Sequence, residues 1–302
     1  MHYNWKFDFV KNRKRFFAIS LIVTLLGILS LSIFQLNLGV DFKAGTTMDV
    51  TFGKKIEKEK VDAILKEGGF KTTTTLGGNK ERITIRFDEV LSAKEEAALK
   101  KTFADTFKAK PSYETNTVDP EIARELARKG IIAVLVASVG IIVYVSIRFE
   151  WRFAVAAVIA LLHDAFVVVT LFSIFRLEVN LPFIVAVLTI IGYSINDTIV
   201  IFDRIRENLR FAKLKNFNDL AALVNNSIWQ TLTRSVNTVL TVLFAALCLF
   251  VFGSESIKLF SLAMIFGLAA GAYSSVFIAS QLWVVMKGKS LHATPKNPVQ
   301  QA

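Results

Sequence analysis

The chain has 302 residues, 53% of them hydrophobic, and its 36 Lys and Arg outnumber its 25 Asp and Glu, for a net charge of +11. The charges are segregated, because residues 37–129 alone hold 18 Lys and Arg and 16 Asp and Glu. This distribution excludes a soluble enzyme, a disordered chain and a nucleic-acid-binding module built around the positive charge. It predicts a polytopic α-helical membrane protein with one water-exposed domain inserted between its spans.

Six apolar runs are long enough to cross a bilayer, whose core of about 30 Å needs about 20 helical residues. These runs are residues 16–36, 130–147, 153–175, 181–202, 236–253 and 259–285. The first run follows a basic stretch but is longer than a cleavable signal, so we expect a retained signal anchor. The predicted organisation is a basic N-terminus with the first span (1–36), an inserted domain (37–129), a five-helix bundle (130–286) and a basic tail (287–302).

The short connections predict the orientation of these spans. With the N-terminus in the cytoplasm, 16 Lys and Arg fall on the inner side, and the two short outer loops receive only Arg176 and Lys258. Because basic connections remain in the cytoplasm, we expect both termini inside and residues 37–129 on the extracytoplasmic side. Most of the net charge is therefore a topology signal.

The inserted domain reads as short strands and two helices. We expect strands at 46–52, 71–76, 81–87 and 112–118, a turn at 77–79, and amphipathic helices at 57–66 and 92–107. Ser92 followed by Glu95 matches a capping box at the start of the second helix. The succession βαββαβ predicts an α+β, ferredoxin-like domain. The only cysteine, Cys248, excludes an intramolecular disulfide, and the domain shows no catalytic constellation, which favours a binding or conformational role.

Ionisable residues within the spans are the functional candidates, because charge is costly in hydrocarbon. Asp197 lies in the inner half of the fourth span, and Arg234 lies at the inner start of the fifth, so the two could meet at similar depth. Burial favours the protonated form of a carboxylate and a nearby arginine favours the charged form, a competition that suits a proton carrier. Asp164 in the third span is a further relay candidate. His163 beside it should point to another helix face. Polar pairs can also simply hold helices together.

Smaller polar and glycine residues complete the candidate site. The supporting polar residues are Ser194, Asn196, Thr198 and Asn237. The Gly267–Gly271 spacing predicts close helix packing. No metal, cofactor or nucleophile motif is present. An intramembrane aspartyl protease built on Asp164 and Asp197 ranks low, because the residues around Asp197 are bulky rather than glycine-rich.

Three motifs carry a family resemblance: GVDFKAG at 39–45, GYSINDTIVIFDRIRENLR at 192–210 and SIWQTLTRSVNTVLT at 227–241. They closely resemble the SecF branch of the SecD/SecF family of bacterial protein-export membrane proteins, which are relatives of the RND transporters. Gly39, Asp41 and Gly45 belong to the family's turn motif. Ala44 stands where the family usually has a second glycine, and alanine disfavours a positive φ.

The resemblance implies a non-enzymatic, multi-pass protein of the bacterial cytoplasmic membrane. It implies pairing with SecD, separate or fused, beside the SecYEG channel, with the SecA ATPase acting earlier on the translocating unfolded polypeptide. It also implies use of the proton motive force, with Asp197 and Arg234 in proton conduction. The alternatives are a proton-coupled RND-type exporter of a small or lipid-like solute, and a pure assembly scaffold.

Overall fold

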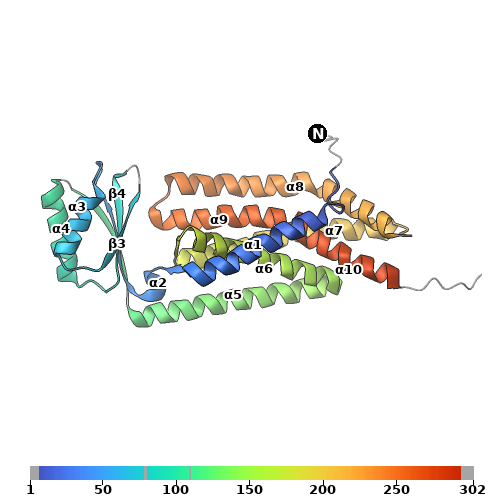
Figure 1. Ribbon diagram of the computed structural model, residues 1–302, viewed down its shortest axis with the longest axis horizontal. Coiled ribbons are helices and arrows are strands. Elements are labelled where there is room, and N and C mark those ends of the chain that lie inside the picture. Colours follow the sequence, from blue (N-terminus) through green and yellow to red (C-terminus); the bar gives the residue numbers. More distant parts are fainter. Residues whose placement is uncertain (1–6, 78–79, 109, 294–302) are drawn as a thin grey trace, which may run out of the picture.

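An α+β domain stands at one end of a long helical bundle in the computed structural model, which describes residues 7–77, 80–108 and 110–293 (Figure 1). The domain is inserted between the first long helix, α1, and the next one, α5. The chain therefore leaves the bundle once and returns once to place the whole domain, as the segregation of charge predicts.

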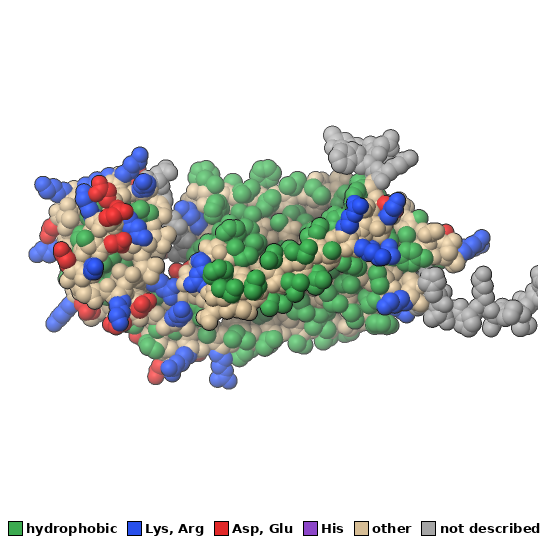
Figure 2. Space-filling view, in the orientation of Figure 1, with side chains coloured by type: hydrophobic (Ala, Val, Ile, Leu, Met, Phe, Trp, Pro, Cys, Tyr) green, Lys and Arg blue, Asp and Glu red, His purple; other side chains and the backbone are tan. Residues whose placement is uncertain are grey.

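Within the residues that the structure describes, the bundle contains six helices that are long and apolar enough to cross a membrane, which agrees with the predicted number of spans. Their bounds are α1 Arg13–Phe34, α5 Pro120–Arg148, α6 Trp151–Ile174, α7 Leu181–Phe211, α8 Phe217–Phe252 and a last span built from α9 Glu255–Ser274, a π-helical turn Ser275–Ala279 and α10 Ser280–Ala293. Lateral surfaces of the bundle are apolar, and Lys and Arg gather at the end opposite the inserted domain (Figure 2). This is the surface of a membrane-spanning protein.

Three helices form the centre of the bundle. About half of the most apolar window of α6, of α7 and of the last span is buried, against 11% for α1, α5 and α8. Contacts of α7 with α9 and of α6 with α9 join the central helices, and α1 packs on α6. Side chains that matter to the protein's interior should therefore lie on α6, α7 and α9.

Several helices extend beyond the predicted apolar spans. α5 begins at Pro120 rather than 130, and α8 begins at Phe217 rather than 236. Hydropathy detects only the apolar part of such a helix, whereas the backbone continues to the local start signals. These signals are Pro120 in the first turn of α5 and a capping box of Asn216 and Asp219 on α8.

The inserted domain follows the expected succession of elements. These are β2 Gly45–Thr51, α3 Lys58–Glu67, β3 Thr72–Gly77, β4 Arg82–Phe87, α4 Ala93–Phe107 and β5 Ser112–Val118. The sheet order is β3-β4-β2-β5 with antiparallel neighbours. Each pair of strands joined through a helix thus has a strand of the other pair between them. Two residues of the predicted turn, 78 and 79, lie outside the described residues.

Alternating apolar residues give the sheet one buried face. Met48 and Val50 of β2 and Ile83 and Ile85 of β4 are fully buried and pack with residues of α3 and α4 in one core. Side chains alternate between the faces of a strand, so β2 and β4 bury one face beneath both helices. At the start of α4 the predicted capping box is confirmed, because Ser92 accepts from the backbone N–H of Glu95 at 3.3 Å.

A small junction that the sequence analysis missed ties the inserted domain to the bundle. β1 (Asn37–Leu38) pairs in parallel with β6 (Glu178–Val179), which lies between α6 and α7. The short helix α2 (Val40–Lys43) follows β1, and Asp41 Oδ2 accepts from the backbone N–H of Leu181, the first residue of α7, at 2.7 Å. Asp41 therefore links the entry to β2 directly to α7.

Two consecutive residues with positive φ form the turn between α2 and β2. Ala44 has a φ of 66° and Gly45 a φ of 122°. A Cβ on Gly45 would meet the carbonyl oxygen of Phe87 in the neighbouring strand. The backbone thus keeps the left-handed conformation at Ala44 although alanine disfavours it, and it requires glycine at Gly45.

Candidate functional site

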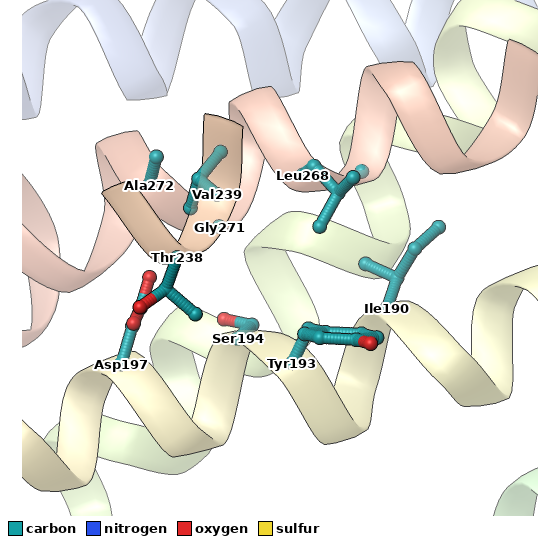
Figure 3. Close-up of a pocket in the computed structure, with 10 residues that line it drawn as sticks. Ile190, Tyr193, Ser194, Asp197, Thr238, Val239, Leu268, Gly271 and Ala272 are labelled. Carbon is teal, nitrogen blue, oxygen red and sulfur yellow. The ribbon is translucent and has the colours of Figure 1, made fainter. Parts of the chain in front are cut away.

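Asp197 lies on α7 beside a small cavity between α7, α8 and α9. Its side chain is buried, at 6% exposure. α7 contributes Ser194 and Asp197 to the cavity wall, α8 contributes Thr238, and α9 contributes Gly267 and Gly271 (Figure 3). The cavity volume is about 10 Å³, which is room for about one water molecule. The buried carboxyl therefore faces a space that can hold one proton-carrying molecule.

Glycines on α9 make this cavity narrow. A Cβ on Gly267 would collide with Ile190, and one on Gly271 would lie 3.1 Å from Ser194 Cβ. The predicted packing role of this glycine pair is thus confirmed, because only glycine lets the backbone of α9 approach α7 so closely.

Arg234 lies on α8, one helical turn before Thr238, which lines the same cavity as Asp197. Within the described part of the chain no ion pair within 4.0 Å joins Arg234 to Asp197, and Arg234 is exposed on the bundle surface. The structure therefore places Arg234 on a helix that borders the Asp197 cavity, without a closed ion pair between the two side chains.

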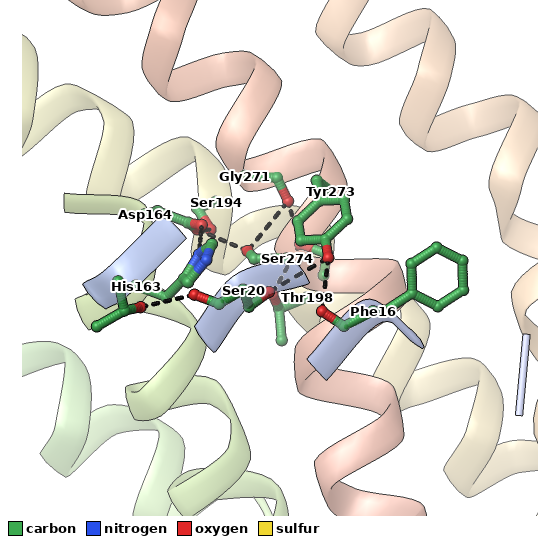
Figure 4. A network of polar contacts seen from close by, with 11 residues as sticks. Phe16, Ser20, His163, Asp164, Ser194, Thr198, Gly271, Tyr273 and Ser274 are labelled. Carbon is green, nitrogen blue, oxygen red and sulfur yellow. Dashed lines mark hydrogen bonds and ion pairs between the residues drawn. The ribbon is translucent and has the colours of Figure 1, made fainter. Parts of the chain in front are cut away.

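Asp164 on α6 is fully buried and holds three helices together. Its Oδ2 accepts hydrogen bonds from Ser194 Oγ of α7 at 2.5 Å and from Ser274 Oγ of α9 at 2.7 Å (Figure 4). Both donors reach the same oxygen atom, so one carboxyl oxygen of α6 joins α7 and α9.

His163 contacts Asp164, contrary to the expectation that the two neighbours point to different helix faces. Its Nδ1 lies 3.3 Å from Asp164 Oδ1. The physical reason is that both side chains are long enough to bend toward each other, although their Cα–Cβ bonds point to different faces of the helix. The ring lies 6.2 Å from that of Tyr273, whose hydroxyl contacts Ser20 of α1 at 3.2 Å.

The other predicted polar residues divide into two groups. Ser194 and Thr198 are buried, and Thr198 Oγ1 lies 2.9 Å from Ser275 Oγ at the π-helical turn. Asn196 and Asn237 are exposed, so the structure does not bring them to either carboxylate. Gly39, Asp41 and Gly45 lie at the junction with the inserted domain, where Asp41 contacts the first residue of α7, whereas Asp197 lies in the middle of that helix.

Sequence reasoning missed the contribution of α9 to the site. Ser274 follows Gly267 and Gly271 at helical spacing, so it lies on the same face of α9. That spacing was the available signal, since a hydroxyl on the glycine face of a packed helix must meet the neighbouring helix.

Among the residues that the structure describes, no group of three or more His, Cys, Asp or Glu could hold a metal ion. Two serine hydroxyls occupy Oδ2 of Asp164, and no hydrogen bond joins Asp164 to Asp197 in the described ranges. The facing pair of aspartates that a protease would need is thus not formed there.

Comparison with known proteins gives one family. Residues 98–289 match the protein export membrane protein SecD/SecF, C-terminal family, and residues 29–56 match the SecD/SecF GG motif. The chain is 44% identical to the protein translocase subunit SecF of Alicyclobacillus acidocaldarius, over 95% of this chain and 94% of that protein. It is 48% identical to the protein translocase subunit SecDF of Bacillus subtilis, over 95% of this chain and 39% of that protein.

A solved structure agrees with these relatives. The crystal structure of SecDF from Thermus thermophilus, described as a translocon-associated membrane protein, superposes with a TM-score of 0.85 at 35% identity. The match covers 94% of this chain and 39% of that one. The chain thus spans about two fifths of its SecDF relatives and nearly all of its SecF relatives.

Proposed function

Because the chain belongs to the SecD/SecF family of protein export membrane proteins, we propose that it is a non-enzymatic auxiliary subunit of the Sec protein translocase. It uses the proton motive force to promote late steps of polypeptide export across the bacterial cytoplasmic membrane. The observation that carries the proposal is a buried carboxyl, Asp197, beside a cavity of about one water in a bundle joined directly to an inserted domain.

Proton binding at Asp197 drives the cycle in this proposal. The Asp197 carboxyl is buried, and burial favours the neutral form of a carboxyl, whereas a positive charge such as Arg234 on the adjacent helix favours the charged form. Loss or gain of one proton therefore changes the attraction between α7 and α8. A proton crossing the membrane releases about 2.3 kcal/mol per 100 mV, enough to bias the direction of a moving polypeptide.

SecD is the expected partner within the membrane. Asn196, Arg234 and Asn237 are exposed on α7 and α8, and polar side chains facing lipid are costly. A second helical bundle that covers this strip would remove the cost. The SecDF relatives are long enough to supply such a bundle in the same chain.

The remaining neighbours follow from this assignment. Both termini lie in the cytoplasm and the inserted domain faces the extracytoplasmic side, where it meets the emerging polypeptide. The SecYEG channel lies beside the complex, and SecA acts on the other side of the membrane. Gentle solubilisation should therefore recover SecD and SecY with this chain, whereas an exporter of small solutes would be recovered as a self-dimer.

Export into energised inverted vesicles tests the proton role. Asp197→Asn should remove the part of export that depends on the gradient, because the amide cannot release a proton. Asp203→Asn is the matched control, since Asp203 lies on the same helix in an ion pair with Arg206 at 2.7 Å. Unchanged gradient-dependent export by Asp197→Asn at normal protein levels would refute the proposal and favour a scaffold.

A further inference from the structure

We propose that Asp164 is a second proton-binding carboxyl, and that the Ser194 hydroxyl connects it to Asp197. The inference rests on the proposed function, because it extends the path of the same proton. In this inference the buried contact of Asp164 with Ser194 is a step of the proton path as well as a link between α6 and α7.

Ser194 is the one side chain in the described structure that touches both sites. It lies one helical turn before Asp197 on α7 and lines the same cavity, with its hydroxyl on the side toward Asp197 (Figure 3). The same hydroxyl donates to Asp164 Oδ2 at 2.5 Å (Figure 4). One water in the cavity would complete a chain of hydrogen bonds from one carboxyl to the other.

The transfer balances with proton movements alone. Asp197 gives its proton to the water, the water gives one of its own to Ser194 Oγ, and Ser194 gives its hydroxyl proton to Asp164 Oδ2. Only O–H bonds form and break, and water and serine are regenerated. Asp197 ends as a carboxylate and Asp164 as a neutral acid.

The hydrogen-bonding groups around Asp164 can accommodate both its charged and its protonated form. In the charged state, Ser194 and Ser274 both donate to Oδ2, and His163 lies against Oδ1. In the protonated state, the serine hydroxyls can rotate, because each can accept as well as donate. Of the titratable groups on the helices around it, His163 of α6 lies against Asp164 Oδ1, Tyr273 of α9 packs beside the His163 ring, and Asp197 of α7 lies one helical turn from Ser194.

The competing explanation is that Asp164 only clamps α6, α7 and α9. The substitution Asp164→Asn separates the two, because an amide oxygen still accepts from Ser194 and Ser274 but the group no longer titrates. A clamp would survive this change, whereas a proton site would not.

The test uses the full chain with its membrane partners in inverted vesicles and measures gradient-dependent export. We expect export to fall about tenfold in Ser194→Ala, the scale expected for losing a hydrogen bond to a charged group, and to be lost in Asp164→Asn. The matched control is Ser173→Ala, since Ser173 is fully buried on α6 and its hydroxyl contacts Ser30 at 3.0 Å, away from both carboxylates. This control should export like the wild type.

Infrared titration supplies a second readout that does not depend on export activity. The pH-dependent C=O band of protonated carboxylic acid contains every Asp and Glu of the chain, so the difference between the wild type and Asp164→Asn isolates the contribution of Asp164, which should change with pH. A wild-type spectrum in which Asp164 never changes protonation overturns the inference, as does normal export by both Asp164→Asn and Ser194→Ala. If those two variants export normally while Asp197→Asn does not, this inference fails and the proposed function stands. Normal export by Asp197→Asn instead removes the proposed function itself.

Discussion

Adding one methyl group at Gly45 should strongly destabilise the strand β2 that it begins. Its φ of 122° is a conformation that side chains rarely adopt, and an added Cβ would meet the carbonyl oxygen of Phe87. Backbone strain of this kind costs about 1–3 kcal/mol. The contact is with backbone of the adjacent strand, which cannot rotate away, so we expect Gly45→Ala to destabilise β2 by about 3 kcal/mol, the upper end of that range.

Hydrogen exchange of the full chain in nanodiscs measures this effect. A loss of about 3 kcal/mol should lower the protection of the β2 amides about a hundredfold, since about 1.4 kcal/mol corresponds to a factor of ten. The neighbouring change Ala44→Gly should act in the opposite direction. It relieves about 1–3 kcal/mol of strain from the positive φ at Ala44 and costs about 0.4–1 kcal/mol through the larger entropy of the unfolded chain, so protection should rise a few-fold. Equal protection in wild type and Gly45→Ala would refute the reasoning.

A Cβ on Gly267 would collide with Ile190, so Gly267→Val should lower the melting temperature in nanodiscs, with an overpacking cost of about 1–3 kcal/mol. An unchanged melting curve would mean that α7 and α9 separate easily there. Ser92→Ala removes the capping-box acceptor and should destabilise α4 by about 1 kcal/mol, measured as exchange protection of its first turn. The exposed Ser112 lies outside α4, so Ser112→Ala should leave that protection unchanged. Burial raises the pKa of Glu178 above its usual 4.5, so the folded junction binds its proton more tightly than the unfolded chain. The stability of β6 should therefore be highest below pH 4.5 and should fall as the pH rises through the raised pKa of Glu178 in the folded protein. Glu178→Gln should make the exchange protection of β6 independent of pH over the same range.

Periodic and apolar segments were predictable from the sequence because each carries its signal within a short stretch. The six spans, the strands of the inserted domain and the Ser92 capping box all depend on neighbours in sequence. β1 and β6 were not predictable, because two-residue strands have no periodicity and pair across a wide separation along the chain.

The candidate site shows the same division. Asp197 stands out because a carboxylate in an apolar run is rare. The partners of Asp164 could not be identified in the same way, since Ser274 reaches it from α9 and serine is common in membrane helices. The contact of His163 depends on a side-chain rotamer, which helix-face reasoning does not resolve.

The hydrogen bond between Asp41 and the first residue of α7 has a thermodynamic consequence. α7 also carries Asp197, so in the proposed cycle a displacement of this helix on proton binding reaches the start of the inserted domain. Coupling free energies are reciprocal. If the proposed function holds, a polypeptide that binds the inserted domain in one position changes the proton affinity of Asp197 by the same factor by which protonation changes the binding of the polypeptide. The infrared titration of Asp197, repeated with and without a stalled export substrate, would measure that factor, and identical curves would show that Asp197 and the first turn of α7 act independently.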